Sequence, residues 1–418
     1  MRDAIVIGAG HAGLAASRRL RDAGLDHLVL ERGEVGESWR AQRWDSFTLN
    51  TPNSMNLLPG ATPDGDPDGF EGRDAWIARL ERYVRDHALP VMTRKTVTSV
   101  ERDDGGFVVA VAGDAPIRTR TVIVASGMVN APKVPAAAAE LDDRIGRLTT
   151  GTYRRPDQLD PGAVLLVGSA QSGVQIAEDL LDAGREVYLA TGTVGRMPRR
   201  MRGRDSLYWM REVGWFDERP EDLPDPALMT AAQPQISGVG ARGHTVSLQS
   251  LAARGVTLLG HLEAIGGTRV RFAQDLAEHI RHADEWSRRK REQVDAHIAR
   301  HGLDAPPSAP DPADEPVRDP GSFRSPADLD LIDRGITTVI FTTGFGADLG
   351  WLRLPDCVSD RGRPVHDAGR APVDGLWFLG WSWLRKRQSS IIQGAADDSA
   401  HVVEQLVARL TGASPRRS

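Results

Sequence analysis

The pattern of apolar and polar residues at the start of the chain predicts a strand, a tight turn and a helix in close succession. Small apolar residues at 4–7 predict a buried parallel strand, and a helical stretch follows at 14–23. The sequence GAGHAG at 8–13 joins the two, and a second apolar run at 27–30 ends on Glu31. This order of elements is typical of a dinucleotide-binding unit.

Each glycine of this loop, and the acid that follows it, has a physical role. Gly8 permits the tight turn, Gly10 lets a pyrophosphate approach the backbone, and Gly13 lets the helix pack on the strand. Free amides at the helix start attract phosphates. Glu31 follows the last glycine at close to the roughly 20 residues expected of a ribose-binding carboxylate. The candidate contacts of this first unit are Gly8, Gly10, His11, Ala12, Gly13 and Glu31.

Residues 164–173, VLLVGSAQSG, repeat this beginning 160 residues later, with Gly168 after Gly8 and Gly173 after Gly13. Ala170 replaces Gly10, and Thr191 replaces the acid. An uncharged residue followed by arginines accommodates a 2′-phosphate, which an acid would repel. We therefore expect FAD in the first unit and NADPH in the second, although the arginines are also compatible with a solvated basic face. The candidate contacts of the second unit are Gly168, Ser169, Gln171, Ser172, Gly173, Thr191, Arg196 and Arg199.

The remaining pattern predicts an α/β fold with two Rossmann-like nucleotide-binding domains, the second inserted in the first. Residues 1–150 and 345–418 are expected to form the FAD domain, and residues 151–344 the NADPH domain, with a helical excursion at about 202–322. Antiparallel strands are predicted at 96–101, 107–111 and 117–124, and helices at 76–87, 272–300 and 395–410.

Composition narrows the possible functions. The 418 residues carry 52 basic and 57 acidic side chains, so the net charge of −5 gives no electrostatic case for nucleic acid or an anionic membrane. A single cysteine, Cys357, excludes an internal disulfide and a CxxC redox pair. The first strand begins near Met1 and leaves no room for a signal peptide, and the apolar runs are short, so we expect a soluble cytoplasmic protein. The histidines lack metal-ligand spacing, so no metal is expected. A homodimer is expected only because dimers are the commonest oligomers of soluble proteins.

Several stretches together make the chain resemble the class B flavin-dependent monooxygenases, in the bacterial and plant branch that includes auxin-forming enzymes. Besides the two glycine loops, they are GESWR at 36–40, WDSFTLNTPNSMNLLPG at 44–60, VIVASGMVNAPKVP at 122–135, FTTGF at 341–345 and GLWFLGWSW at 375–383. The resemblance implies that NADPH reduces FAD, that dioxygen adds at flavin C4a, and that the hydroperoxide oxygenates a small substrate at nitrogen or sulfur.

The resemblance also assigns positions. It places Trp39 and Arg40 along FAD, Gly127 and Gly344 in the interdomain linkers, and Gly380 and Gln393 against the flavin ring. Asn50 matches the flavin-facing asparagine of amine-oxidising members and is the candidate catalytic residue, although an Asn before Thr51-Pro52 is as readily a turn cap.

One family fingerprint is largely absent. Its tyrosine position is Tyr153, but Thr149 stands where the family has histidine, and Asp143 and Ile145 stand at its Phe and Gly positions. This departure weakens the case for Baeyer–Villiger oxygen insertion. The alternatives are an NADPH oxidase or flavin reductase that releases hydrogen peroxide, and a non-enzymatic flavoprotein that senses NADPH.

Overall fold

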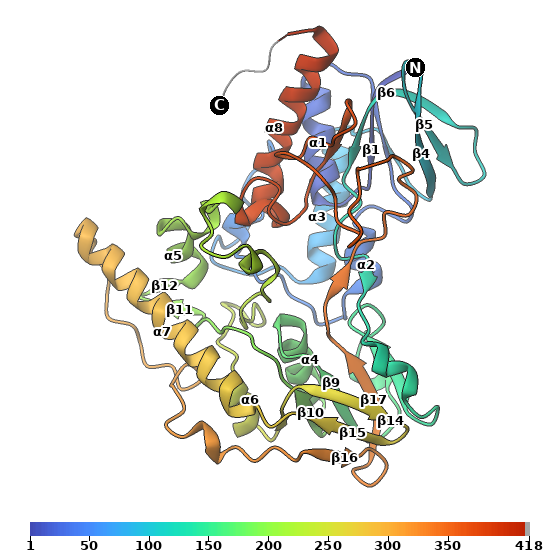
Figure 1. Cartoon of the computed structure of the whole chain (residues 1–418). Coiled ribbons are helices and arrows are strands. Elements are labelled where there is room, and N and C mark those ends of the chain that lie inside the picture. Colours follow the sequence, from blue (N-terminus) through green and yellow to red (C-terminus); the bar gives the residue numbers. More distant parts are fainter. Residues whose placement is uncertain (414–418) are drawn as a thin grey trace.

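The computed structural model describes residues 1–413 and contains two α/β units joined by two adjacent linkers (Figure 1). The first sheet has parallel strands β1 (Arg2–Ile7), β2 (His27–Leu30), β3 (Val91–Met92), β6 (Ile117–Val124) and β19 (Leu376–Phe378). Strands β5 (Gly106–Val111) and β4 (Val97–Asp103) extend it as an antiparallel hairpin beside β6. Helices α1 (His11–Asp22), α2 (Glu37–Gln42), α3 (Arg73–Asp86) and α8 (Ile392–Thr411) complete this unit.

The second sheet is fully parallel, in the order β13 (Thr257–Leu259), β10 (Val187–Ala190), β9 (Ala163–Val167), β17 (Ile336–Phe341) and β8 (Gly146–Thr149). All five residues of β9 are buried, because the strand is apolar on both faces, as a central parallel strand requires. Helices α4 (Gln171–Asp182) and α6 (Leu248–Ala253) belong to this unit. The mixed α/β architecture with two Rossmann-like units confirms the predicted fold class.

The remaining elements surround the second sheet. Strands β14 (Leu262–Gly266), β15 (Arg269–Phe272) and β16 (Asp328–Asp330) form a small antiparallel sheet, and β11 (Arg200–Met201) pairs with β12 (Arg204–Asp205). Helix α5 (Ser206–Glu212) and the long helix α7 (Leu276–His301) lie away from the first sheet (Figure 1). Within the stretch 202–322 that is expected as an excursion of the second domain, β13 joins the second sheet and α6 packs against its core.

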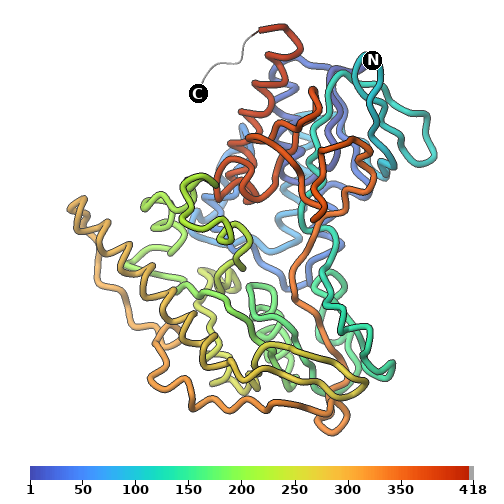
Figure 2. Tube along the Cα trace, viewed as in Figure 1, coloured from blue at the N-terminus to red at the C-terminus, as the bar shows by residue number. Residues whose placement is uncertain are grey.

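The two linkers run side by side between the units, as the Cα trace shows (Figure 2). Their short strands β7 (Ala131–Pro132) and β18 (Phe345–Gly346) pair antiparallel. Strand β8 already belongs to the second sheet, so the chain crosses between units before residue 146, and the predicted boundary at 150 is too late. The second crossing follows β17 and lies beside the predicted boundary at 345.

A buried charge cluster fixes α7 and the proline-rich segment 305–320 to the second unit. The side chain of Arg196 is fully buried, and its guanidinium pairs with Asp284 of α7, 2.8 Å away, and with Asp314. Asp314 also pairs with Arg291 and accepts a 2.8 Å hydrogen bond from Ser287. The segment without regular structure is thus held by a carboxylate inserted between two arginines.

Removing Asp314 should be costly. The Asp314→Ala substitution leaves the buried Arg196 without one of its two carboxylates, and we expect the free energy of unfolding in urea to fall by about 3–5 kcal/mol. The matched control is Asp295→Ala, which breaks the exposed Arg202–Asp295 pair, with an expected loss below about 1 kcal/mol. Equal losses in the two variants would contradict a structural role for the buried cluster.

Candidate functional site

The first glycine loop shows which of its glycines the fold itself requires. Gly8 has φ +107°, and a Cβ there would lie 2.4 Å from the Ala125 carbonyl oxygen. A Cβ at Gly13 would lie 1.9 Å from the Gly8 carbonyl oxygen, so α1 touches the turn. A Cβ at Gly10 would have no neighbour within 4 Å. The chain therefore needs Gly8 and Gly13 for its own packing, whereas Gly10 leaves open space at the start of α1.

The second loop repeats this geometry. Gly168 has φ +109°, and a Cβ at Gly173 would lie 1.9 Å from the Gly168 carbonyl oxygen. Ala170 occupies the position before α4 that Gly10 occupies before α1, with nearly the same extended backbone conformation. Both helices thus present their first amides in the same way.

Both loops line one cavity of about 1210 Å³ between the units. This exceeds the roughly 300–1,000 Å³ of a site for one small ligand, so the cleft has room for more than one. Its lining acids among the described residues are Glu31 and Glu37, whereas its lining cations are Arg32, Arg43, Lys133, Arg361, Arg363 and Arg387. The excess of positive charge favours anionic ligands such as dinucleotides.

Two buried polar atoms of residues that line the cleft beside the first loop have no hydrogen-bond partner within residues 1–413. They are His11 Nε2 and Ser126 Oγ. Burial lowers the pKa of His11 to about 4, so its ring is neutral at neutral pH. Buried polar atoms are normally satisfied, and a dinucleotide bound against the first loop would supply partners. The residues present therefore fit FAD.

The residue that follows the second strand of each unit is an acid, Glu31, in the first unit and the uncharged Thr191 in the second. Glu31 lines the cleft and accepts hydrogen bonds from the amides of Ala9, at 2.7 Å, and Gly33, at 3.0 Å. Its pKa is raised by burial, which those hydrogen bonds oppose. Thr191 also lines the cleft, but its hydroxyl donates to the Leu259 carbonyl at 2.7 Å and lies 2.8 Å from His279 Nδ1.

The expectation that Arg196 and Arg199 bind a 2′-phosphate is wrong. Arg196 is enclosed by the carboxylate cluster described above. The Arg199 guanidinium pairs with the buried Asp205, lies 4.3 Å from the centre of the Phe70 ring, and is absent from the cleft wall. Because Asp284 and Asp314 are far from Arg196 in sequence, the local pattern gave no signal of these pairs.

Asn50 bridges the two units. Its side chain donates to Gln171 Oε1 at 3.1 Å and accepts from Gln175 Nε2 at 2.7 Å, both on α4. Its carbonyl oxygen accepts a hydrogen bond from Arg199 at 3.0 Å. The side chain therefore does not cap its own turn but joins the loop of the first unit to the nucleotide helix of the second, on the wall of the cleft.

Most of the other predicted residues also lie on this wall. Arg40 is an exception, because its guanidinium pairs with Glu81 of α3. Three further predicted residues do not line the cleft, namely Gly13, Gly173 and Gln393. A Cβ at Gly380 would lie 2.6 Å from Ala12 Cβ, so the glycine there lets the C-terminal segment contact α1. The predicted residues that line the cleft are Gly8, Gly10, His11, Ala12, Glu31, Trp39, Asn50, Gly127, Gly168, Ser169, Gln171, Ser172, Thr191, Gly344 and Gly380.

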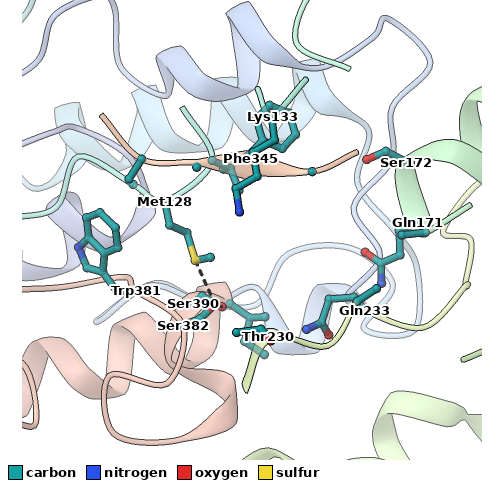
Figure 3. Close-up of a pocket in the computed structure, with 18 of the residues that line it drawn as sticks. Met128, Lys133, Gln171, Ser172, Thr230, Gln233, Phe345, Trp381, Ser382 and Ser390 are labelled. Atoms are coloured by element: carbon teal, nitrogen blue, oxygen red, sulfur yellow. Dashed lines mark hydrogen bonds between the residues drawn. The ribbon is translucent and has the colours of Figure 1, made fainter. Parts of the chain in front are cut away.

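The structure adds residues that the motifs did not single out. Met128, Lys133, Phe345, Trp381, Ser382 and Ser390 surround the middle of the cleft (Figure 3). Trp215 and Phe216 pack in a core with Trp209 and also line the cleft. Met128, Lys133, Phe345, Trp381 and Ser382 fall in the stretches that carry the resemblance, but nothing local indicated which of their side chains face the cavity.

Within residues 1–413, no group of three His, Cys, Asp or Glu side chains is arranged to hold a metal ion. No helix in the described part of the chain combines the length and apolar character needed to cross a membrane.

Two glycine loops of the dinucleotide-binding type open on one cleft, and this arrangement is typical of oxidoreductases with two dinucleotide-binding domains. Residues 5–213 match the model of the pyridine nucleotide-disulphide oxidoreductase family, and the chain belongs to this family. An uncharacterized oxidoreductase of Bacillus subtilis, CzcO, is 27% identical, covering 97% of this chain and 99% of that protein.

The similarities confirm the resemblance to class B flavin-dependent monooxygenases. Rice indole-3-pyruvate monooxygenase YUCCA1 is 26% identical to this chain, and the match covers 72% of this chain and 76% of the rice protein. A flavin-containing monooxygenase from Stenotrophomonas maltophilia shares the fold, with a TM-score of 0.65, 20% identity and coverage of 98% and 99%. An ornithine N-hydroxylase from Kutzneria, solved with reduced FAD, NADP⁺ and L-ornithine, gives a TM-score of 0.64 at 14% identity, with coverage of 98% and 100%.

Two substitutions in the first loop should separate folding from ligand binding. Gly10→Ala adds a methyl group in open space with a compatible backbone, φ −79°, so stability should be unchanged while the affinity for FAD falls about tenfold, or about 1.4 kcal/mol. Gly13→Ala forces α1 off the turn and should cost about 1–3 kcal/mol of stability. Thermal unfolding of the apoprotein and FAD titration measure the two effects. A destabilised Gly10→Ala variant with normal FAD affinity would contradict this division.

Proposed function

We propose that this oxidoreductase is an FAD-dependent, NADPH-using monooxygenase that oxygenates a small molecule at nitrogen or sulfur. The observation that carries the proposal is the single cleft lined by both nucleotide loops, with open space at Gly10 and unpartnered polar atoms around it. The monooxygenase activity named for the rice relative supports oxygen transfer, and the N-hydroxylase activity named for the Kutzneria structural neighbour supports oxygenation at nitrogen. The overall reaction consumes NADPH, a proton and dioxygen, and yields NADP⁺, water and the oxygenated substrate.

The chain supplies binding and orientation. In this proposal the amides at the start of α1 hold the FAD pyrophosphate, and Glu31 accepts hydrogen bonds from its ribose. The start of α4, with Ser169, Gln171 and Ser172, holds the pyrophosphate of NADPH. When bound there, FAD would supply the redox chemistry between NADPH and dioxygen.

Asn50 has a positioning role here. Because its side chain is bonded to Gln171 and Gln175, it fixes the start of α4 relative to the first unit. These contacts would keep the nicotinamide and flavin sites at a fixed relative position across the cleft. NADPH preference then derives from the uncharged Thr191, where an acid would repel the 2′-phosphate, rather than from Arg196 or Arg199.

Rapid mixing tests the central step. The anaerobically NADPH-reduced holoprotein is mixed with oxygenated buffer while the flavin absorbance is followed. We expect a persistent spectrum between those of reduced and oxidised flavin, which disappears when an amine or sulfide substrate is added. Direct return of oxidised flavin with stoichiometric hydrogen peroxide, with and without substrates, would instead identify a peroxide-releasing NADPH oxidase.

A charge at position 191 tests the assignment of the second nucleotide. Thr191→Glu places a carboxylate where the first unit has Glu31, so the NADPH concentration for half-maximal flavin reduction should rise about tenfold, equivalent to about 1.4 kcal/mol. NADH, which lacks the phosphate, should be affected much less. Thr191→Ser keeps the hydroxyl and is the matched control. An equal change for NADPH and NADH would place the 2′-phosphate elsewhere.

A further inference from the structure

One wall of the cleft, where the two linkers meet, carries Arg43, which has no carboxylate partner among the described residues. The Arg43 guanidinium lies 5.4 Å, 5.6 Å and 5.7 Å from the ring centres of Trp39, Phe47 and Phe345. Its Nη1 donates only to the neighbouring Gln42 carbonyl, at 3.0 Å. Burial lowers the pKa of Arg43 to about 10, so the group remains charged at neutral pH.

Lys133 adds a second cation to the same wall. Its backbone in the first linker is hydrogen-bonded to the second linker. The Lys133 amide donates to the Gly344 carbonyl at 2.9 Å, and the Lys133 carbonyl accepts from Thr343 Oγ1 at 2.6 Å. Its ammonium points into the cavity beside Phe345 (Figure 3). Within residues 1–413, neither Arg43 nor Lys133 forms an ion pair. We call this pair the hinge wall.

The hinge wall lies apart from the predicted 2′-phosphate position. Phe345 follows β17, and a Cβ at Gly151, just past β8, would lie 3.8 Å from Phe345 and 3.0 Å from Pro132, the neighbour of Lys133, whereas Thr191 directly follows β10. In the sheet order β10, β9, β17, β8 these ends are two to three strand spacings apart, about 10–14 Å. The pyrophosphates have their own sites at the starts of α1 and α4 in the proposed function. The two cations are therefore available to a further anion.

The chemistry of the hinge wall favours a carboxylate. A partly desolvated guanidinium with no counter-ion gains strongly from a planar anion that accepts two hydrogen bonds, and a nearby ammonium adds to the attraction. We propose that the hinge wall binds the carboxylate of the oxygenated substrate, which is thus a small organic acid. This inference rests on the proposed function and names its substrate class. The rest of such a substrate would face Met128, Trp381 and Ser382 in the middle of the cleft (Figure 3).

The test uses oxidised holoprotein with bound FAD and no turnover, so that its outcome is independent of oxygen transfer. Phenylacetate, hexanoate and methylthioacetate are titrated at up to millimolar concentration, each against its neutral amide, while the visible flavin spectrum is followed. We expect at least one acid to perturb the spectrum with a dissociation constant at least about tenfold below that of its amide. Lys133→Met and Arg43→Met should each raise that constant about tenfold, whereas Arg43→Lys should raise it less.

The control variant is Arg94→Met, which removes an exposed cation paired with Glu34 outside the cleft and should leave acid binding unchanged. NADP⁺ affinity, measured by the same spectral change, should stay within about twofold in Lys133→Met. Weaker NADP⁺ binding with unchanged acid binding would overturn the proposal and assign the hinge wall to a cofactor phosphate. Equal affinity for acids and amides, or no response to any acid, would overturn it as well. Failure of the protein to bind FAD would instead refute the proposed function.

Discussion

The close contact between each nucleotide helix and its own glycine turn is the constraint on which the cleft depends. At Gly13 and Gly173 there is no room for even a methyl group, because the preceding turn carbonyl lies where it would stand. Each helix is therefore fixed at its first turn, with its free amides directed beyond the end of the central strand. Since both units obey the same constraint, the chain builds two equivalent helix N-termini, which in the proposed function bind the two pyrophosphates.

Those two ends face one another only because the units are joined at several points. The paired linker strands β7 and β18 set the axis between the sheets. Asn50 then connects the first unit to α4, and Arg199 connects the carbonyl of Asn50 to Asp205. An arginine that the pattern assigned to a phosphate is thus part of the interdomain contact. The cleft is consequently a product of long-range polar contacts as much as of the two folds.

Local sequence patterns were sufficient for the parts of the structure that local geometry determines. The spacing of Gly8 and Gly13 predicted both loops, and helices and antiparallel strands with strong periodicity lie close to their predicted positions. Strand β13 was missed, because three residues carry too little periodicity. The Arg196–Asp314 pair spans 118 residues, and the ring of Phe345 reaches Arg43 from about 300 residues along the chain, so tertiary packing alone creates these contacts.

One of the four differences between the two loops, Gly10 against Ala170, bears on how closely a nucleotide can approach each helix. At Gly10 the space next to the helix amides is empty, so a pyrophosphate can reach the backbone directly, whereas the methyl group of Ala170 stands at the equivalent place in the second loop. Closer approach gives shorter charge-assisted hydrogen bonds and slower dissociation. In the proposed function, this methyl group would favour slower dissociation of FAD from the first loop than of NADPH from the second.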